Sequence, residues 1–369
     1  MNKKVCCIFN LAPHYNSPIY RLMDEEIECH FYLGDKLPLS IRRMNYDELE
    51  GFKKTLRNIF VFGNFYWQKG AIWLVFKRYS VFIITGELYN ISTWIIIILA
   101  RIMKKETVLW SHGYYGDETF IKRKLKKIFF SLSTSVLLYG NHAKNIMISE
   151  GIQESKLFVI YNSLDYEKQL SVKAKLKTSD IYKNYFGNDF PTVIYIGRIQ
   201  RNKRVEMLIQ ALDRLINRGV NCNVVIVGKE VESLNLLDQI EDRGLIRNIW
   251  LFGPCYDETT IGKLISNSDI CVIPGDSGLS IMHSFVYGTP VITHDNFAKH
   301  GPEFEAVEPG ITGDFFVENS IEHLCEMMSH WLSITPEKKS QIKNDCFQVI
   351  EKRYNPRVQV DLIKNILRS

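Results

Sequence analysis

Short runs of apolar, β-branched and aromatic residues alternate along the chain with segments whose apolar residues recur every three or four positions. The runs lack the alternation of a half-exposed strand, which is typical of strands covered by helices on both faces. Strands alternating with helices in this way predict βαβ units and parallel sheets. The strands are expected at 5–10, 81–85, 107–111, 136–139 and 158–161, and then at 193–197, 224–227, 249–252, 270–273 and 291–293.

The predicted strands form two groups, separated by the polar, Lys-rich stretch 166–189. We therefore expect an α/β protein with two doubly wound, Rossmann-like domains, 1–165 and 166–345, that face each other across a cleft. The closing segment 346–369 has helical spacing and no strand after it, so it either caps the second domain or crosses back to the first. The Ile-rich segment 92–103 is far shorter than the roughly 20 residues that span a bilayer, so it predicts a buried crossover helix.

Composition narrows the class of protein. The 369 residues are 46% hydrophobic and 24% charged, which excludes a disordered or collagen-like chain. The eight cysteines include no C-x-x-C pair, so reduced thiols are expected instead of a disulfide framework or a zinc site. The apolar run at the N-terminus is too short for a signal peptide, and a cytoplasmic location is expected.

Charge is unevenly distributed. Residues 1–165 carry 22 Lys/Arg against 15 Asp/Glu, whereas residues 166–369 carry 24 against 26. The densest basic run, 122–130, places five cations beside apolar residues at helical spacing. Such a helix suits the anionic lipids of the inner face of a cytoplasmic membrane, and a solvated helix face is the alternative. Nucleic acid is not an expected partner, because no recognition motif accompanies the charge.

Two segments carry candidate phosphate chemistry. The first is the strand ending at Gly197, followed by Arg198, Lys203 and Arg204 before an amphipathic helix. Cations at a strand-to-helix turn suit a diphosphate, and a solvated basic loop is the alternative. In the second, 270–288, a glycine-flanked turn leads into a short helix whose backbone N–H groups suit a phosphate. The polar positions that share one face of that helix are Ser280, His283, Ser284 and Tyr287.

These segments resemble the GT-B glycosyltransferases of family 4, also called glycosyl transferases group 1. The resemblance rests on G-R-I-Q-R-N-K at 197–203 and P-G-D-S-G-L-S-I-M-H-S-F-V-Y-G-T-P-V-I at 274–292. Supporting strings lie at 225–228, 249–253 and 312–313, and more thinly at 110–113 and 161–165. The resemblance implies a retaining transfer of a sugar from a nucleotide sugar to an acceptor, with no bound metal and no other cofactor.

The resemblance also implies roles for particular residues. Arg198 and Lys203 match the pair that neutralises the donor diphosphate, as fixed cations can do without reorganisation. Gly278, Leu279 and Ser280 match the loop whose N–H groups touch the phosphates. The remaining matches are Gly197 and Gly253 beside the nucleoside and His112 near the donor sugar and the acceptor.

One departure from the family pattern concerns a pair of glutamates eight positions apart. The matching positions here are Gly275 and His283. A carboxylate accepts two hydrogen bonds from ribose hydroxyls, whereas a neutral imidazole has one donor and one acceptor. His283 is therefore expected at the ribose or a phosphate, with Asp276 and Ser284 as neighbouring substitutes.

Further candidates lie at predicted strand ends. His14 and Tyr15 follow the first strand, where a histidine base would suit an inverting displacement. Glu87 follows the strand 81–85 and is a candidate for acceptor hydroxyls, with surface placement as the alternative. Glu303 and Glu305 are candidates for the donor sugar, and Glu308 is expected to be structural.

Together these observations predict a hexosyl- or deoxyhexosyl-type glycosyltransferase at the membrane surface. Its acceptor is expected to be a saccharide, lipid-linked, as in bacterial capsule, O-antigen or exopolysaccharide assembly. The alternatives are an inverting GT-B transferase with His14 as its base and a non-catalytic GT-B homologue. A nicotinamide-dependent oxidoreductase is disfavoured because G-x-G-x-x-G is absent.

Overall fold

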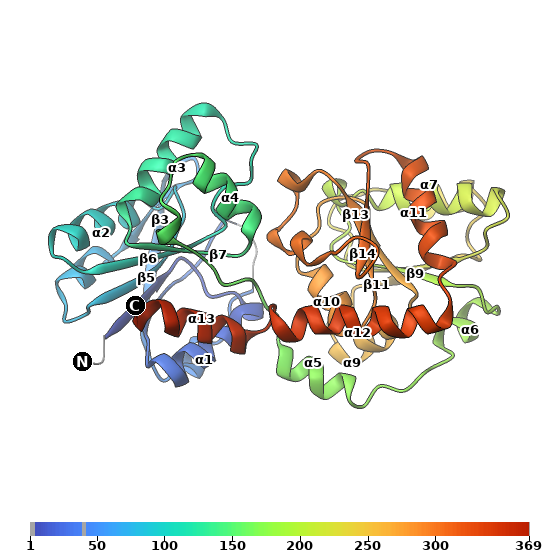
Figure 1. Cartoon of the computed structure of the whole chain (residues 1–369), viewed down its shortest axis with the longest axis horizontal. Helices are drawn as coiled ribbons and strands as arrows, with labels where there is room; N and C mark the ends of the chain where they lie inside the picture. Colours follow the sequence, from blue (N-terminus) through green and yellow to red (C-terminus); the bar gives the residue numbers. More distant parts are fainter. Residues whose placement is uncertain (1–3, 39–41, 369) are drawn as a thin grey trace. The chain divides into compact units, whose positions relative to one another are not determined.

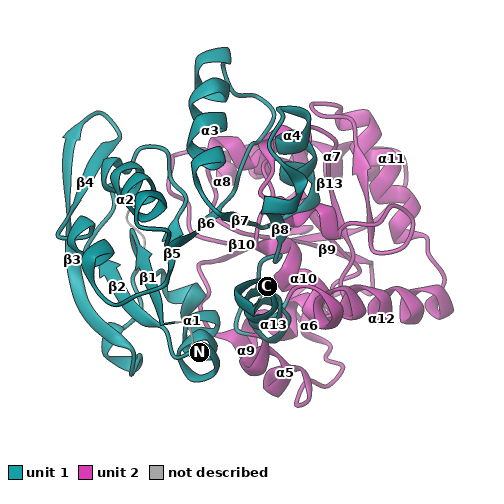
Figure 2. Ribbon diagram, turned by 60° about the vertical axis from the view of Figure 1, so that its left-hand side comes forward, with its two compact units in different colours: residues 1–165, 355–369 teal, residues 166–354 magenta. Residues whose placement is uncertain are grey.

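The computed structural model of the chain describes residues 4–38 and 42–368. The chain divides into two compact units (Figure 2): unit 1 is Met1–Asp165 with Asn355–Ser369, and unit 2 is Tyr166–Tyr354. The return to unit 1 begins at Asn355 and not at 346, because helix α12 (Pro336–Lys352) continues through 346 and packs against α10 (Ser280–Val286) of unit 2.

Unit 1 contains an eight-stranded sheet in the order β4-β3-β2-β1-β5-β6-β7-β8. Its strands are β1 (Val5–Phe9), β2 (His30–Gly34), β3 (Phe52–Phe62), β4 (Phe65–Lys69), β5 (Val81–Thr85), β6 (Glu106–Ser111), β7 (Ser135–Leu138) and β8 (Leu157–Val159). Strand β4 pairs antiparallel with β3, and the other pairs are parallel. The apolar pattern did not predict β2, β3 or β4, because β3 is largely exposed and β2 mixes polar with apolar residues.

Helices cover both faces of this sheet, and the alternation of β1 shows how. Cys7 and Phe9 join the core beneath α1 (Ser17–Ile27) and α13 (Pro356–Arg368), whereas Cys6 and Ile8 face the opposite core. Helices α1 and α13 lie side by side (Figure 1). The opposite core is covered by η3 (Ile72–Phe76), α2 (Ile91–Ile102), α3 (Phe120–Leu132) and α4 (Asn141–Ser149).

Unit 2 contains a fully parallel sheet in the order β11-β10-β9-β12-β13-β14. Its strands are β9 (Thr192–Ile196), β10 (Asn223–Val227), β11 (Ile249–Gly253), β12 (Ile270–Ile273), β13 (Val291–His294) and β14 (Gly313–Phe316). The helices besides α10 and α12 are α5 (Tyr166–Lys173), α6 (Ile181–Phe186), α7 (Val205–Asn217), α8 (Leu236–Asp242), α9 (Glu258–Ser266) and α11 (Ile321–Leu332). In chain order this is the 3-2-1-4-5-6 arrangement of a Rossmann fold.

Each sheet has a point where the strand order reverses. In unit 2 the chain proceeds outward from β9 to β11 and then returns to β12 on the other side of β9. In unit 1 the corresponding neighbours are β1 and β5. Ligands of doubly wound sheets bind beyond the carboxyl ends of the strands at such points, so each unit has one expected site.

Candidate functional site

Two turns meet at the reversal point of unit 2, one after β9 and one after β12. The Asp276 N–H donates to the Asn202 carbonyl oxygen at 3.0 Å, and Asn202 Nδ2 donates to Asp276 Oδ2 at 2.7 Å. Lys203 Nζ donates to the Asp276 carbonyl oxygen at 2.5 Å. A Cβ at Gly275 would lie 2.1 Å from the Asn202 carbonyl oxygen. This contact explains why glycine occupies the position where the resemblance expects a glutamate.

Arg198 and Lys203 bring two cations to these turns. Arg198 is exposed, and its guanidinium forms no ion pair within the part of the chain that the structure describes. Burial lowers the pKa of Lys203; Asp276 and Glu303 oppose the shift, and the nearby Arg198 adds to it. Because two neighbouring cations disfavour each other's charge, an anion placed between them would stabilise both.

Backbone N–H groups face the same turn. Those of Gly278, Leu279 and Ser280 precede or begin α10 and donate to no backbone carbonyl among the residues that the structure describes. The Ser277 N–H is already used, because it donates to His300 Nδ1 at 3.0 Å, and Ser277 Oγ lies 2.9 Å from the same nitrogen. The start of α10 therefore offers donors to an anion.

His300 is fixed by its neighbours in one neutral tautomer. Its Nε2 donates to the His294 carbonyl oxygen at 2.8 Å, which leaves Nδ1 as the acceptor for Ser277. The two imidazole rings stack with centroids 4.0 Å apart. Burial lowers the pKa of both histidines to about 4. Sequence reasoning missed this pair, because His294 ends a strand and His300 lies in a loop, and neither position is unusual for histidine.

His283 contacts a carboxylate from another helix. Its Nε2 lies 2.8 Å from Oε1 of Glu258, the first residue of α9, and Tyr287 Oη donates to the same oxygen at 2.6 Å. Burial raises the pKa of Glu258, but hydrogen bonds from His283, Tyr287 and Gln169 outweigh it, so the net shift is downward. The structure thus places a carboxylate beside position 283, where the motif itself lacks one. Sequence reasoning missed Glu258, since a glutamate in the first turn of a helix is common.

Two further donor-side candidates are Ser284 and Gly253. Ser284 is fully buried at 0% exposure, so the structure places it in the core beneath α10 and not on the surface of the site. The Gly253 carbonyl accepts from the Gly228 N–H at 2.9 Å.

The three glutamates of the 303–308 segment also differ. Glu303 is buried in η7 (Pro302–Ala306), with its carboxylate against Gly301 and 3.9 Å from the position of a Cβ on Gly278. Glu305 is half-buried in the same turn. Glu308 pairs with Arg353 at 2.5 Å, a structural contact within unit 2.

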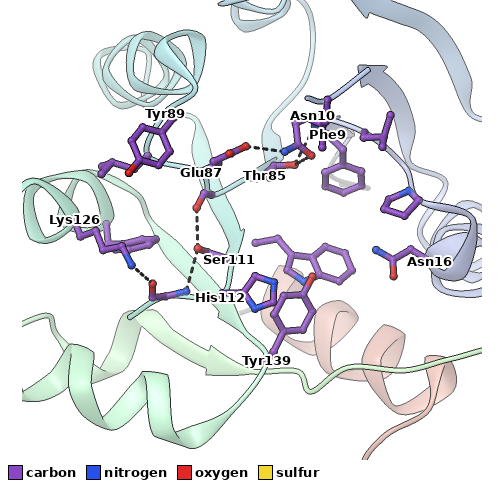
Figure 3. Close-up of a pocket in the computed structure, with 18 of the residues that line it drawn as sticks. Phe9, Asn10, Asn16, Thr85, Glu87, Tyr89, Ser111, His112, Lys126 and Tyr139 are labelled. Atoms are coloured by element: carbon purple, nitrogen blue, oxygen red, sulfur yellow. Dashed lines mark hydrogen bonds between the residues drawn. The ribbon is translucent and has the colours of Figure 1, made fainter. Parts of the chain in front are cut away.

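At the reversal point of unit 1, the loops after β1, β5 and β6 line a pocket of about 500 Å³ (Figure 3). Glu87 Oε2 accepts from Asn10 Nδ2 and from Tyr66 Oη, both at 2.7 Å, and the Asn10 N–H donates to Thr85 Oγ1 at 3.1 Å. The aromatic residues in the lining are Phe9, Tyr15, Tyr20, Tyr89, Trp110, Tyr115, Phe130 and Tyr139. A positioned carboxylate among aromatic faces suits a ligand with hydroxyl groups and C–H faces.

His112 lies at the edge of this pocket, directly after β6. Its ring stacks on Tyr115 with centroids 5.9 Å apart. The ring centroids of His112 and Tyr139, which lie side by side in Figure 3, are 4.7 Å apart. Ser111 Oγ donates to the Gly86 carbonyl oxygen at 2.8 Å and accepts from the Gly113 N–H at 3.1 Å. The histidine is therefore carried on a loop that is tied to the neighbouring strand end.

A buried ion pair fixes the far side of the same loop. Lys126 Nζ donates to Glu118 Oε1 and to the Gly113 carbonyl oxygen, both at 2.6 Å. Glu118 also accepts from the N–H groups of Tyr115 and Gly116. Burial raises the pKa of Glu118, but these hydrogen bonds outweigh it and hold that pKa below its ordinary value.

The predicted lipid-contacting run 122–130 requires a correction. Lys126 is buried in the ion pair, and Arg123 bonds to Glu150 at 3.0 Å and to the Gly116 carbonyl oxygen at 2.9 Å. Phe129 and Phe130 are buried in the core. Lys122 is half-buried and lines the pocket, so the exposed cations of α3 are Lys124 and Lys127, beside the exposed Leu125 and Ile128.

His14 and Tyr15 separate in the structure. Tyr15 lines the pocket, whereas His14 does not and is exposed in η1 (His14–Asn16), with Nδ1 3.2 Å from the Arg42 carbonyl oxygen.

Within residues 4–38 and 42–368, no cluster of three metal-binding side chains occurs. The helices of these same ranges are each too short or too polar to cross a membrane.

Comparison with solved structures identifies the fold. HepE from Anabaena, solved in complex with UDP, superimposes with a TM-score of 0.74 at 17% sequence identity over 99% of each chain. The protein therefore has the GT-B fold of glycosyltransferases, with two parallel-sheet α/β units.

The sequence comparisons relate unit 2 to known glycosyltransferases. Residues 177–345, most of unit 2, match the family model described as glycosyl transferases group 1. Alpha-D-kanosaminyltransferase of Streptomyces kanamyceticus is 25% identical over 57% of this chain and 53% of its own length. The capsular polysaccharide biosynthesis glycosyltransferase CapM of Staphylococcus aureus is 24% identical over 36% and 35%. The chain spans about half the length of the first curated relatives it matches.

Proposed function

We propose that this protein transfers a hexosyl or deoxyhexosyl group from a nucleotide sugar to a saccharide acceptor. The observation that carries the proposal is the pairing of Arg198 and Lys203 with the free N–H groups at 278–280, all at the reversal point of unit 2. The group 1 family match over the same unit and the UDP in the HepE structure support a nucleotide donor.

The chemistry follows from where charge develops. When the glycosidic bond to the donor breaks, the leaving nucleoside diphosphate gains negative charge. Arg198, Lys203 and the N–H groups of 278–280 are positioned to stabilise that charge with no metal or other cofactor. Retention of the anomeric configuration is part of the proposal and rests on the resemblance at 197–203 and 274–292, in which Gly275 and His283 replace the paired glutamates.

The pocket of unit 1 is the proposed acceptor site. Glu87 would accept hydrogen bonds from saccharide hydroxyls, and the aromatic lining would contact C–H faces. His112 at the pocket edge would contact the reacting sugar. The inverting alternative with His14 as the base has less support, because His14 lies outside the pocket lining.

The proposed acceptor is a lipid-linked saccharide of capsule, O-antigen or exopolysaccharide assembly. The name of the relative CapM supports the polysaccharide class. Location at the inner face of the cytoplasmic membrane is supported by the remaining cations and apolar residues on the surface of α3.

Thermal shift with nucleotides tests the donor site. The ligands to test are UDP, GDP, dTDP and CMP, each with and without a sugar, and at least one of them should raise the melting temperature. At a hundredfold excess over Kd, that ligand should add about 2.7 kcal/mol to the free energy of unfolding. Arg198→Ala with Lys203→Ala should abolish the shift. Arg201→Ala is the matched control, because Arg201 lies in the same turn with a side chain 84% exposed.

Two outcomes would reject parts of the proposal. If no nucleotide raises the melting temperature, the donor site is wrong. If a nucleotide binds but neither sugar transfer nor hydrolysis of the donor follows, the protein is the non-catalytic homologue.

A further inference from the structure

An exposed apolar surface lies on unit 1 apart from the pocket and apart from α3. It consists of Trp73 and Phe76 on η3 and of Ile98, Ile102 and Met103 at the end of α2, and is called here the η3–α2 patch. Trp73 is 72% exposed and Ile102 is 73% exposed. Contiguous exposure of large apolar side chains marks an interaction surface.

The two elements of the patch are held together. Helix α2 packs against η3, and Lys105 Nζ donates to the carbonyl oxygens of Val75 at 2.7 Å and Lys77 at 2.6 Å. The rings of Trp73 and Phe76 lie with centroids 5.9 Å apart. Beneath them, Leu74 and Val75 are buried in the core. The exposed aromatic residues are therefore carried on an anchored support.

The exposed charged residues that adjoin the patch in sequence are cations. Lys77 and Arg78 follow Phe76, and Arg101 and Lys104 flank Ile102, and all four are exposed. Glu106, the acidic residue nearest in sequence, is half-buried at the start of β6. Cations around exposed aromatic and aliphatic side chains complement a lipid bilayer, whose headgroups can be anionic and whose interior is apolar.

We infer that the η3–α2 patch docks onto a membrane containing anionic lipids, with Trp73 and Phe76 entering the interface. Tryptophan favours that depth because its ring is apolar with one polar N–H. Helix α2 also packs against α3, and Trp94 contacts the buried Phe129 with ring centroids 4.8 Å apart, so both helices cover the same face of the sheet. The inference adds a second, aromatic contact to the lipid contact of the proposed function.

Vesicle sedimentation of the full chain tests the inference. The wild-type protein should bind vesicles of phosphatidylcholine mixed with phosphatidylglycerol, and bind phosphatidylcholine alone much more weakly. Trp73→Ser with Phe76→Ser should weaken binding by about tenfold or more, since both interfacial anchors are lost. Arg78→Gln with Lys104→Gln should reduce binding to the anionic vesicles specifically.

Matched controls distinguish docking through the η3–α2 patch from non-specific binding of exposed aromatic residues to vesicles. Phe62→Ser removes an aromatic that is 81% exposed on the β3–β4 hairpin of the same unit, and Tyr256→Ser removes one that is 83% exposed in unit 2. Both variants should bind vesicles like the wild type. The nucleotide thermal shift should be unchanged in every variant, so failure of docking and failure of the donor site are recorded separately.

Three results would overturn the inference. They are a wild-type protein that ignores anionic vesicles, equal binding to both vesicle types, and wild-type binding by the Trp73→Ser, Phe76→Ser variant. A concentration-dependent dimer that the same variant abolishes, without vesicle binding, would assign the patch to a second copy of the chain.

Discussion

The two units differ in how they use charge and apolar surface. Unit 1 carries 25 Lys/Arg against 16 Asp/Glu, and unit 2 carries 21 against 25. Among the described residues, 14 large apolar side chains are exposed on unit 1 and nine on unit 2. Including the returning helix α13 in unit 1 makes the charge asymmetry larger than the division at residue 165 suggested.

The difference shows that net charge and functional charge are separate properties. Unit 2 is acidic overall, yet it places Arg198 and Lys203 at one turn beside free N–H groups. Unit 1 is basic overall, but Lys126 is buried in a structural ion pair and its other cations are spread over outer elements. The net charge of a unit therefore does not identify its binding site, which depends on where individual cations are placed.

The strongest test of this comparison removes a cation of unit 1 that is not on the surface. Lys126→Ala should destabilise unit 1 by about 3 kcal/mol, because it leaves the buried Glu118 without its ion pair. Calorimetry should show a lower melting temperature with the nucleotide shift retained. Lys183→Ala, at the exposed pair with Asp189, should change the melting temperature little. Equal effects would mean that Lys126 is an ordinary surface lysine.

Acid should weaken unit 2 through its buried histidine pair. The pKa of His300 and of His294 is about 4 in the fold, whereas an unfolded histidine titrates near 6.5. Between pH 6.5 and pH 4 the histidines are therefore protonated in the unfolded state but neutral in the folded state. The free energy of unfolding falls as the pH drops through this range. The loss should be about 3 kcal/mol for one histidine, measured by urea unfolding at a series of pH values. His300→Gln should flatten the slope, and an unchanged slope would place the titration elsewhere.

Gly275→Ala tests whether the two turns of unit 2 must touch. The new Cβ would lie 2.1 Å from the Asn202 carbonyl oxygen and 2.7 Å from Lys203 Cα, so Lys203 has to move. Nucleotide affinity should fall by about tenfold, or 1.4 kcal/mol, in a titration. Gly310→Ala is the control, since that glycine has positive φ but open space around it. Equal losses of affinity in both variants would show that the close approach does not position Lys203.

The smallest expected effect concerns the carboxylate beside His283. Glu258→Gln keeps the shape but removes the charge that His283 contacts at 2.8 Å. Nucleotide affinity should fall by about 1 kcal/mol in a titration, because the hydrogen bond between His283 and residue 258 loses its charged partner. Tyr287→Phe, which loses only the second hydrogen bond to Glu258, should reduce the affinity less. Wild-type affinity in Glu258→Gln would make the pair purely structural.

Parts of this architecture were accessible from the sequence for a physical reason. Buried parallel strands such as β9 and β12 are continuous apolar runs, and cations after Gly197 stand out against them. Strands β3 and β4 were missed, because their apolar runs at 59–62 and 65–67 are short, lie next to polar residues and are largely exposed in β3. Tertiary pairings such as Glu258 with His283, or Lys126 with Glu118, join residues whose individual positions are unremarkable. Sequence spacing alone could not distinguish the buried Lys126 from its exposed neighbours.

The placement of α13 has a consequence for the order of assembly. Unit 2 is one continuous segment, whereas unit 1 is interrupted by it and needs Val360, Ile363 and Leu367 to close the core beneath α1. During synthesis from the N-terminus, all of unit 2 emerges before that helix does. Part of the core of unit 1 therefore stays uncovered while the whole of unit 2 is synthesised, and it closes only afterwards.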